Sequence, residues 1–177
     1  MQYTTTYQSP IGKILLAADA IGLTGLWFEG QKFYANGLAC KNEKKEIPVF
    51  AEVKEWLNLY FSGEEPEVLP PIHMIGTEFQ MEVWKILQKI PYGATTTYGE
   101  IAKEIARKRG LVRMSAQAVG GAVGHNEISI IIPCHRVVGA NGSLTGYAGG
   151  IEKKKKLLEL EGIDTQIFRI PTRGTAL

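Results

Sequence analysis

The chain has 177 residues, of which 45% are hydrophobic and 21% are charged, so it can bury the core of one compact domain or of two small ones. This composition excludes a chain that is disordered along most of its length. It has no run of about 18 apolar residues, and the N-terminal stretch MQYTTTYQSP lacks the basic and apolar regions of a secretory signal. We therefore expect a cytoplasmic protein with no membrane partner.

The net charge of +2 is unevenly distributed. Residues 1–76 hold 6 lysines and arginines against 9 acidic residues, whereas residues 77–162 hold 12 against 8. A basic second half indicates an anionic partner, with nucleic acid as the leading candidate, although many proteins with such a surface bind no anion. The two cysteines, Cys40 and Cys134, are too few for a disulfide framework and show no zinc-ligand spacing.

The first half of the chain reads as an antiparallel meander followed by a helix. Strands are predicted at residues 3–7, 13–18 and 21–28. Residues 31–47 are polar and irregular, and Pro48 opens a helical pattern whose apolar face can cover one face of the sheet. The stretch GEEPEVLPPIHMIG at residues 63–76 has no periodicity and is the best linker candidate. We predict an N-terminal domain at residues 1–70, a linker at 71–76, a C-terminal domain at 77–162 and a tail at 163–177.

The second half begins with helices. Capping-box spacings at Thr77 and Thr97 predict two of them, the first ended by Pro91-Tyr92-Gly93 and the second by Gly110. A basic connector covers residues 107–113, and Ser115 can cap a third helix, AQAVGGAVG. Two short helices across a tight connection resemble a helix-turn-helix, although small residues also serve close helix packing.

The chemistry centres on residues 128–138, ISIIIPCHRVV, which we predict to be a buried strand ending in Cys134, His135 and Arg136. A thiol beside a histidine and an arginine is suited to forming a thiolate, whereas a buried core cysteine is the alternative. In an extended strand the side chains at 134 and 135 point to opposite faces. A contact between them needs a turn at Pro133 or a bridging water.

Residues 77–162 resemble the O6-alkylguanine-DNA alkyltransferases, also called methylated-DNA–protein-cysteine methyltransferases. The resemblance is carried by PYGATTTYGEIA, AVGGAVGHN, PCHRV, GYAGG and LLELEG. It implies an α+β fold, with an N-terminal ribonuclease H-like domain of antiparallel sheet plus helix. The C-terminal domain would be mostly helical, with a winged-helix-like helix-turn-helix. The implied function is DNA repair by direct reversal, with double-stranded DNA containing alkylated guanine as the partner.

The resemblance also implies roles for individual residues. Cys134 would take the alkyl group from O6 of a flipped-out guanine, and O4-alkylthymine is a further candidate substrate. His135 would act as general base through a water, and Glu161 would orient His135. Asn126 would brace the turn that precedes the active site. Because a methyl thioether has no good leaving group, each molecule would act once. We expect no metal and no cofactor, and we expect the protein to be a monomer.

Further positions follow from the same resemblance. The substrate pocket would be formed by the Ser143–Gly150 loop and its surroundings, namely Tyr98, Val137, Tyr147, Ala148 and Gly149. A flipped base needs such a fitted slot because extrusion costs a few kcal/mol. The DNA-contacting residues would lie in the helix-turn-helix and near the active site, namely Arg113, Ser115, Gln117, Ala118, Gly120, Gly121 and Arg136.

The sequence departs from the family at three places. Gln117 stands where the family usually has an arginine that fills the gap left by the flipped base, and the basic connector, in which Arg109 and Arg113 are candidate phosphate contacts, is several residues longer. Glu127 and Ser129 replace two frequent prolines, which suggests a wider pocket and a negative charge near the DNA.

The run KKKK at residues 153–156 is expected to be a solvated helix face.

Two other functions remain open. One is a non-catalytic lesion-binding protein that recognises alkylguanine without repairing it; relatives of this kind lack the acceptor cysteine that is present here. The other is a thiol hydrolase using Cys134 and His135, which would turn over repeatedly because an acyl thioester can hydrolyse.

Overall fold

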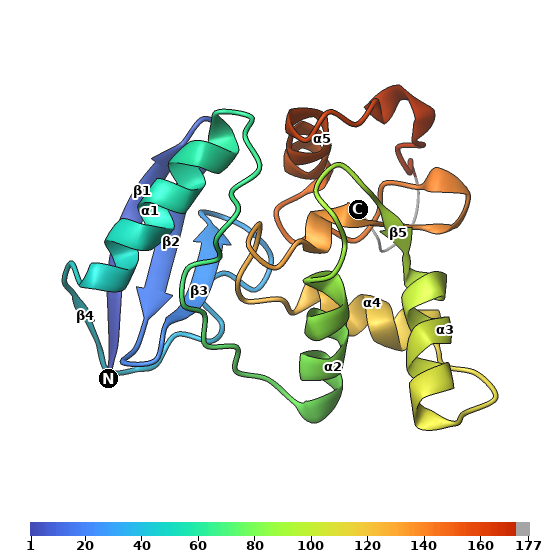
Figure 1. Cartoon of the computed structure of the whole chain (residues 1–177), viewed down its shortest axis with the longest axis horizontal. Coiled ribbons are helices and arrows are strands. Elements are labelled where there is room, and N and C mark those ends of the chain that lie inside the picture. Colours follow the sequence, from blue (N-terminus) through green and yellow to red (C-terminus); the bar gives the residue numbers. More distant parts are fainter. Residues whose placement is uncertain (173–177) are drawn as a thin grey trace. The chain divides into compact units, whose positions relative to one another are not determined.

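The structure is a computed structural model that describes residues 1–172 and forms two compact units. The first unit contains residues 1–75 and 127–131, and the second contains residues 76–126 and the chain from 132 onward. Of the predicted tail 163–177, residues 173–177 lie outside the described part. The first unit carries the larger sheet and the second carries four of the five α-helices of residues 1–172 (Figure 1).

The first unit is built on a four-stranded sheet with the order β3-β2-β1-β4. The predicted antiparallel meander is confirmed by β1 (Gln2–Ser9), β2 (Gly12–Ala18) and β3 (Leu23–Phe28), each paired with the next. The fourth strand, β4 (Asn42–Lys44), runs parallel to β1 in the region predicted to be irregular. Its three residues are polar and exposed, so the sequence carries no alternation that marks a strand.

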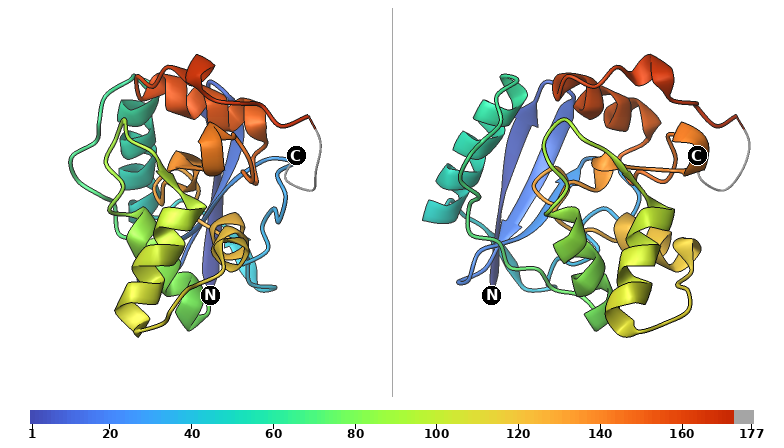
Figure 2. Two further views of the ribbon diagram at one scale, coloured as in Figure 1. Left: turned by 90° about the vertical axis from the view of Figure 1, so that its right-hand side faces the viewer. Right: turned by 45° about the vertical axis from the view of Figure 1, so that its right-hand side comes forward.

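One face of this sheet is covered by α1 (Pro48–Phe61), as both views in Figure 2 show. The helix begins with a proline at its first position, where the missing N–H costs nothing. Its apolar face buries Phe50, Val53, Trp56, Leu57 and Tyr60. The helix predicted from Pro48 is confirmed, and burial of this face against the sheet gives the first unit its core.

Residues 127–131 belong to the first unit although they lie between two segments of the second. The Leu26 N–H donates to the Glu127 carbonyl at 2.8 Å, and the Ser129 N–H donates to the Leu26 carbonyl at 3.2 Å. The Glu127 carboxylate accepts from Trp27 Nε1 at 2.7 Å and from Asn36 Nδ2 at 3.3 Å. The segment thus extends the edge of the sheet at β3, and the Glu127 charge is used inside this unit.

The second unit begins with three helices, α2 (Glu78–Leu87), α3 (Tyr98–Arg109) and α4 (Ala116–Gly124), which pack on one another (Figure 1). Both predicted capping boxes are present, at Thr77 and at Thr97. Gly110 ends α3 with a φ of +64°, a conformation that glycine adopts without strain. Ser115 caps α4, since its side chain accepts from the Ala118 N–H.

The rest of this unit is short strands, single turns and one further helix. The strands β5 (Thr96–Thr97) and β6 (Val137–Val138) pair in parallel. The helix α5 (Ile151–Leu160) packs Leu158 against Val138 and Leu144. Single 3₁₀ turns lie at Cys134–Arg136, Ala140–Gly142 and Thr165–Ile167. Within residues 1–172, no helix has the length and apolar character needed to cross a bilayer.

Candidate active site

Cys134 lies on a tight turn, and the prediction of a buried strand over residues 128–138 is wrong. Only Ile128 makes an isolated bridge and only β6 is a strand in this stretch. Pro133 has φ −81° and ψ 64°, and the Cys134 N–H donates to the Ile132 carbonyl at 2.8 Å, which is a γ-turn. A 3₁₀ turn follows at Cys134–Arg136. The apolar residues signalled burial correctly, but the proline signalled a turn rather than the end of a strand.

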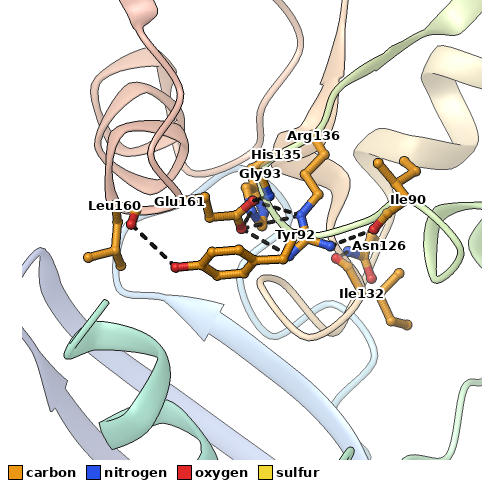
Figure 3. Close-up of polar contacts among 9 residues, drawn as sticks. All are labelled: Ile90, Tyr92, Gly93, Asn126, Ile132, His135, Arg136, Leu160 and Glu161. Atoms are coloured by element: carbon orange, nitrogen blue, oxygen red, sulfur yellow. Dashed lines mark hydrogen bonds and ion pairs between the residues drawn. The ribbon is translucent and has the colours of Figure 1, made fainter. Parts of the chain in front are cut away.

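Asn126 holds this turn closed. Its Nδ2 donates to the Ile132 carbonyl at 2.8 Å (Figure 3). The same carbonyl also accepts from the Cys134 N–H. The Asn126 side chain is buried, with 4% of the residue exposed. The position predicted to brace the turn therefore lies where it can do so.

His135 and Glu161 form a buried pair. His135 Nε2 lies 2.6 Å from Glu161 Oε1, and both side chains are 0% exposed (Figure 3). Glu161 is the residue directly after α5. The 3₁₀ turn at Cys134–Arg136 points the His135 side chain toward Glu161. The predicted orientation of His135 by Glu161 is consistent with this geometry.

Arg136 belongs to the same cluster. Its Nε lies 2.9 Å from Glu161 Oε2 and its Nη2 lies 3.0 Å from Oε1, a two-point contact. Its Nη1 donates to the Ile90 carbonyl at 2.6 Å, and its guanidinium lies over the ring of Tyr92 (Figure 3). The Arg136 side chain is only 11% exposed. Three of its side-chain nitrogens are thus engaged inside the protein, and the expected contact of Arg136 with DNA stays a prediction.

These contacts set the charge states of the pair. Burial by itself raises the pKa of Glu161, but the hydrogen bonds from His135 and Arg136 and the charge of Arg136 outweigh burial and lower it to about 2. Burial lowers the pKa of His135 in spite of Glu161, so the imidazole is neutral. An ionised carboxylate only accepts hydrogen bonds, so Nε2 carries the proton and Nδ1 carries the lone pair. The imidazole is therefore set to act as a base.

Lys154 is a functional candidate that sequence reasoning missed. The residue is 0% exposed, and its Nζ donates to the carbonyls of Val137 at 2.5 Å and Thr145 at 2.7 Å. The expectation of a solvated KKKK face is therefore wrong at this position, because one of four successive helical residues must face the protein. The pattern I-x-x-K-x-x-L-L across residues 151–158, with a lysine on the apolar face, was the available signal.

The Cys134 thiol and Lys154 influence each other. Burial raises the pKa of Cys134, and a hydrogen bond with Asn126 together with the charge of Lys154 acts against that rise. Burial lowers the pKa of Lys154 to about 8, so it carries its charge at neutral pH. A buried ammonium beside a buried thiol stabilises the thiolate at the moment when the thiol loses its proton.

We expect Lys154→Met to slow alkylation of Cys134 about tenfold at neutral pH, because loss of the ammonium raises the pKa of the thiol further and leaves less thiolate. Thiolate increases with pH, so loss of the ammonium should shift the whole pH–rate curve to higher pH. Iodoacetamide labelling of the Cys134 peptide measures this. Lys156→Met, an exposed position on the same helix, is the matched control. An unshifted curve for Lys154→Met would contradict the assignment.

The predicted substrate loop lies against Tyr98. The Tyr98 hydroxyl donates to the Thr145 carbonyl at 3.0 Å, the same carbonyl that accepts from Lys154. Gly146 has a φ of +74°, and a Cβ there would lie 2.7 Å from Tyr98 Oη, so only glycine fits. Burial and the nearby Cys134 raise the pKa of Tyr98 to about 12, which keeps the phenol protonated. Of the other predicted pocket residues, Val137 and Tyr147 are buried, and Ala148 and Gly149 are half-buried.

The predicted DNA-contacting residues share one side of α4 and the chain before it. Arg113, Ser115, Gln117, Ala118 and Gly121 are exposed, and Gly120 is half-buried near the ring of Tyr98. A Cβ at Gly121 would meet nothing within 4 Å. Of the two connector cations expected to contact phosphates, Arg109 forms an ion pair with Glu82 at 2.6 Å. Within residues 1–172, no group of three or more His, Cys, Asp and Glu side chains is placed to hold a metal ion.

Two family models match the chain. The ribonuclease-like domain of 6-O-methylguanine DNA methyltransferase matches residues 2–71, and the DNA binding domain of 6-O-methylguanine DNA methyltransferase matches residues 78–163. Among curated proteins, the methylated-DNA–protein-cysteine methyltransferase of Haemophilus influenzae is 43% identical over 162 residues, 91% of this chain and 87% of the relative. The protein of the same name from Methanosarcina acetivorans is 45% identical over 168 residues, 90% of this chain and 98% of the relative.

Solved structures give the same result. The O6-methylguanine methyltransferase of Mycobacterium tuberculosis matches with a TM-score of 0.76 and 45% identity, over 91% of this chain and 93% of that one. The structure of the Mycobacterium tuberculosis OGT in complex with DNA matches with a TM-score of 0.77 and 42% identity, over 94% of each chain. The predicted two-domain α+β fold, with a ribonuclease-like first part and a DNA-binding second part, is confirmed.

Proposed function

The chain belongs to the 6-O-methylguanine DNA methyltransferase family, and from this premise we propose that Cys134 accepts the alkyl group from O6 of an alkylated guanine in double-stranded DNA. The activity is that of a methylated-DNA–protein-cysteine methyltransferase, and it repairs DNA by alkyl transfer. The observation that carries the residue assignment is the buried His135–Glu161 pair beside a buried thiol whose turn is held by Asn126. Neither the lesion sensor nor the thiol hydrolase needs this combination together with a DNA-binding unit.

The proposed step moves one proton and breaks one bond. The Cys134 thiol gives its proton to His135 Nδ1 through a water, and Glu161 and Lys154 stabilise the resulting charges. The thiolate sulfur attacks the alkyl carbon, a sulfur–carbon bond forms, and the bond from carbon to O6 breaks. The electron pair stays on the guanine, which takes up the proton held by His135 through the water and leaves as unmodified guanine. Because the product is a thioether, neither water nor His135 regenerates the thiolate, so each molecule acts once.

The remaining site residues are proposed in supporting roles. Tyr98, Val137, Tyr147, Ala148 and Gly149 would form the slot for the flipped base, with the Tyr98 phenol able to donate at any physiological pH. On α4, the exposed residues Gln117, Ala118 and Gly121 carry no charge, and Ala118 and Gly121 have small side chains or none. The DNA can therefore approach the backbone closely. Ser115 and Arg113 precede it and would contact phosphates. Repair of O4-alkylthymine, a monomeric state and a cytoplasmic location stay predictions.

The proposal is tested by mass spectrometry of the intact protein and its peptides after incubation with a duplex containing O6-methylguanine. We expect the mass of one methylene on the Cys134 peptide, saturating at one per molecule. The exposed Cys40 in the same sample is the internal control for unspecific alkylation. Lesion-selective binding without an adduct would instead support the lesion sensor, and an adduct on both cysteines would remove the assignment to Cys134.

A further inference from the structure

The connector between α3 and α4 exposes apolar side chains at its tip. Leu111 is 47% exposed and Val112 is 104% exposed, the largest value for any large apolar residue in the described part of the chain. Burying such side chains in a partner is favourable, and leaving adjacent ones in water is not. Two of them in succession on a tip of this kind indicate a contact surface.

The tip has a fixed shape. The Leu111 N–H donates to the Ala106 carbonyl at 2.8 Å, and the Gly110 N–H donates to the Arg107 carbonyl at 3.3 Å, so the end of α3 is closed. The next helix starts six residues beyond Gly110, at Ala116, after the cap made by Ser115. Leu111 and Val112 are thus presented between two capped helix ends, and little conformational entropy is lost when a partner binds them.

Positive charge lies beside this tip. A groove of about 520 Å³ is lined by Leu111, Val112 and Met114 together with Lys103, Arg107 and Arg113, and no acidic residue lines it. Lys108 and Arg109 are paired with Glu104 and Glu82. In contrast, Arg107 and Arg113 form no salt bridge with any residue among 1–172. The available cations are therefore those that face the groove.

We propose that the connector Gly110–Met114 is a second DNA-contacting element, in which Leu111 and Val112 pack against sugars and base edges beside the lesion while Arg107 and Arg113 bind phosphates. The charge favours DNA over a protein partner, because the groove holds cations and no acid. Continuity favours it as well, because the connector runs directly into the exposed residues of α4. Apolar side chains set between arginines suit a distorted duplex, in which they cover bases that have lost a neighbour.

This inference rests on the proposed function, and its test separates the two. The double variant Leu111→Ser/Val112→Ser is compared with wild type for the dissociation constant on a duplex containing O6-methylguanine and for the rate of alkyl transfer from it. We expect binding about tenfold weaker and transfer slower at subsaturating protein. Iodoacetamide labelling of Cys134 should be unchanged, because the variant leaves the thiol and its partners intact. Val68→Ser, an exposed apolar position in the first unit, is the matched control.

A second measurement addresses the charges. Arg113→Gln and Arg107→Gln should each reduce the slope of log affinity against log salt by about one, while Arg109→Gln, which removes a cation already paired with Glu82, should leave the slope unchanged. If the double serine variant lost stability, the salt slopes of the arginine variants would still decide whether the connector contacts DNA. Wild-type affinity and slopes in all connector variants would overturn the inference and point to a protein partner for the tip. Failure of wild type to form an adduct would overturn the proposed function instead.

Discussion

Replacing Cys134 by serine is expected to abolish alkyl transfer, with the rate falling by at least about 10³-fold, while lesion binding remains within a few-fold of wild type. A serine hydroxyl is a far weaker nucleophile than a thiolate, and beside a neutral imidazole it stays almost entirely protonated. The substitution replaces sulfur by the smaller oxygen at a buried position, so the turn closed by Asn126 should persist. The adduct is followed by mass spectrometry, and binding by the dissociation constant for a duplex containing O6-methylguanine.

The comparison with Cys40→Ser makes this prediction specific. Cys40 is exposed and lies in the first unit, so that variant should repair at the wild-type rate. Residual single-turnover transfer in Cys134→Ser would mean that another group accepts the alkyl chain. Loss of binding together with transfer would mean that the substitution disturbed the turn, which the near-ultraviolet circular dichroism spectrum would show.

For Glu161→Gln we expect a loss of both stability and rate. The neutral amide leaves the buried Arg136 guanidinium without its counter-charge, and breaking a buried pair in this way costs about 3–5 kcal/mol. The amide can also present its NH₂ to His135 and so favour the wrong tautomer, and loss of such an orienting partner typically costs about 10–100-fold in activity. Urea unfolding at pH 7 and single-turnover transfer measure the two effects. Glu152→Gln, an exposed position on α5, is the matched control.

The pH dependence provides an independent check on Glu161. Its folded pKa of about 2 is below the ordinary value of 4.5, so its stabilising contribution is fully present above about pH 4.5 and is lost as the pH falls toward 2. The stability difference between wild type and Glu161→Gln should therefore be largest at pH 6–7 and should shrink in acid. A difference that stays constant between pH 6 and pH 3 would show that the carboxylate is not held ionised by His135 and Arg136.

The elements that local patterns specify could be predicted from the sequence. Capping boxes at Thr77 and Thr97, the glycine at 110 and the short runs of strand-forming residues in the first 28 positions predicted the helices and the meander, because each signal acts within a few residues. The stretch 128–138 could not be predicted in this way. Its isoleucines suit a strand, but the backbone there is fixed by contacts with Leu26 and Asn126, and Ile130 is held at a φ of +69°.

At the candidate site, the sequence predicted the residue types better than their partners. Cys134, His135 and Arg136 are adjacent in the chain, so their importance was visible, and Glu161 was named from the resemblance. That Arg136 binds Glu161 depends on a contact across 25 residues. The burial of Lys154 depends on which face α5 turns toward Val137 and Thr145. The spacing of Lys154 from Ile151, Leu157 and Leu158 signals that it lies on the apolar face, but the partners of both side chains come from tertiary packing.

The return of residues 127–131 to the edge of the first sheet affects how the gene can be divided. A fragment starting near residue 76 would keep Ile128, Ile130 and Ile131, all of them buried in the full chain, but would lack β3, with which this segment pairs. Such a fragment would expose these three isoleucines, which lie within four residues of the turn that carries Cys134. The two halves are therefore not exchangeable cassettes, and chimaeras that join the first half of one relative to the second half of another must carry a matching pair of β3 and the 127–131 segment.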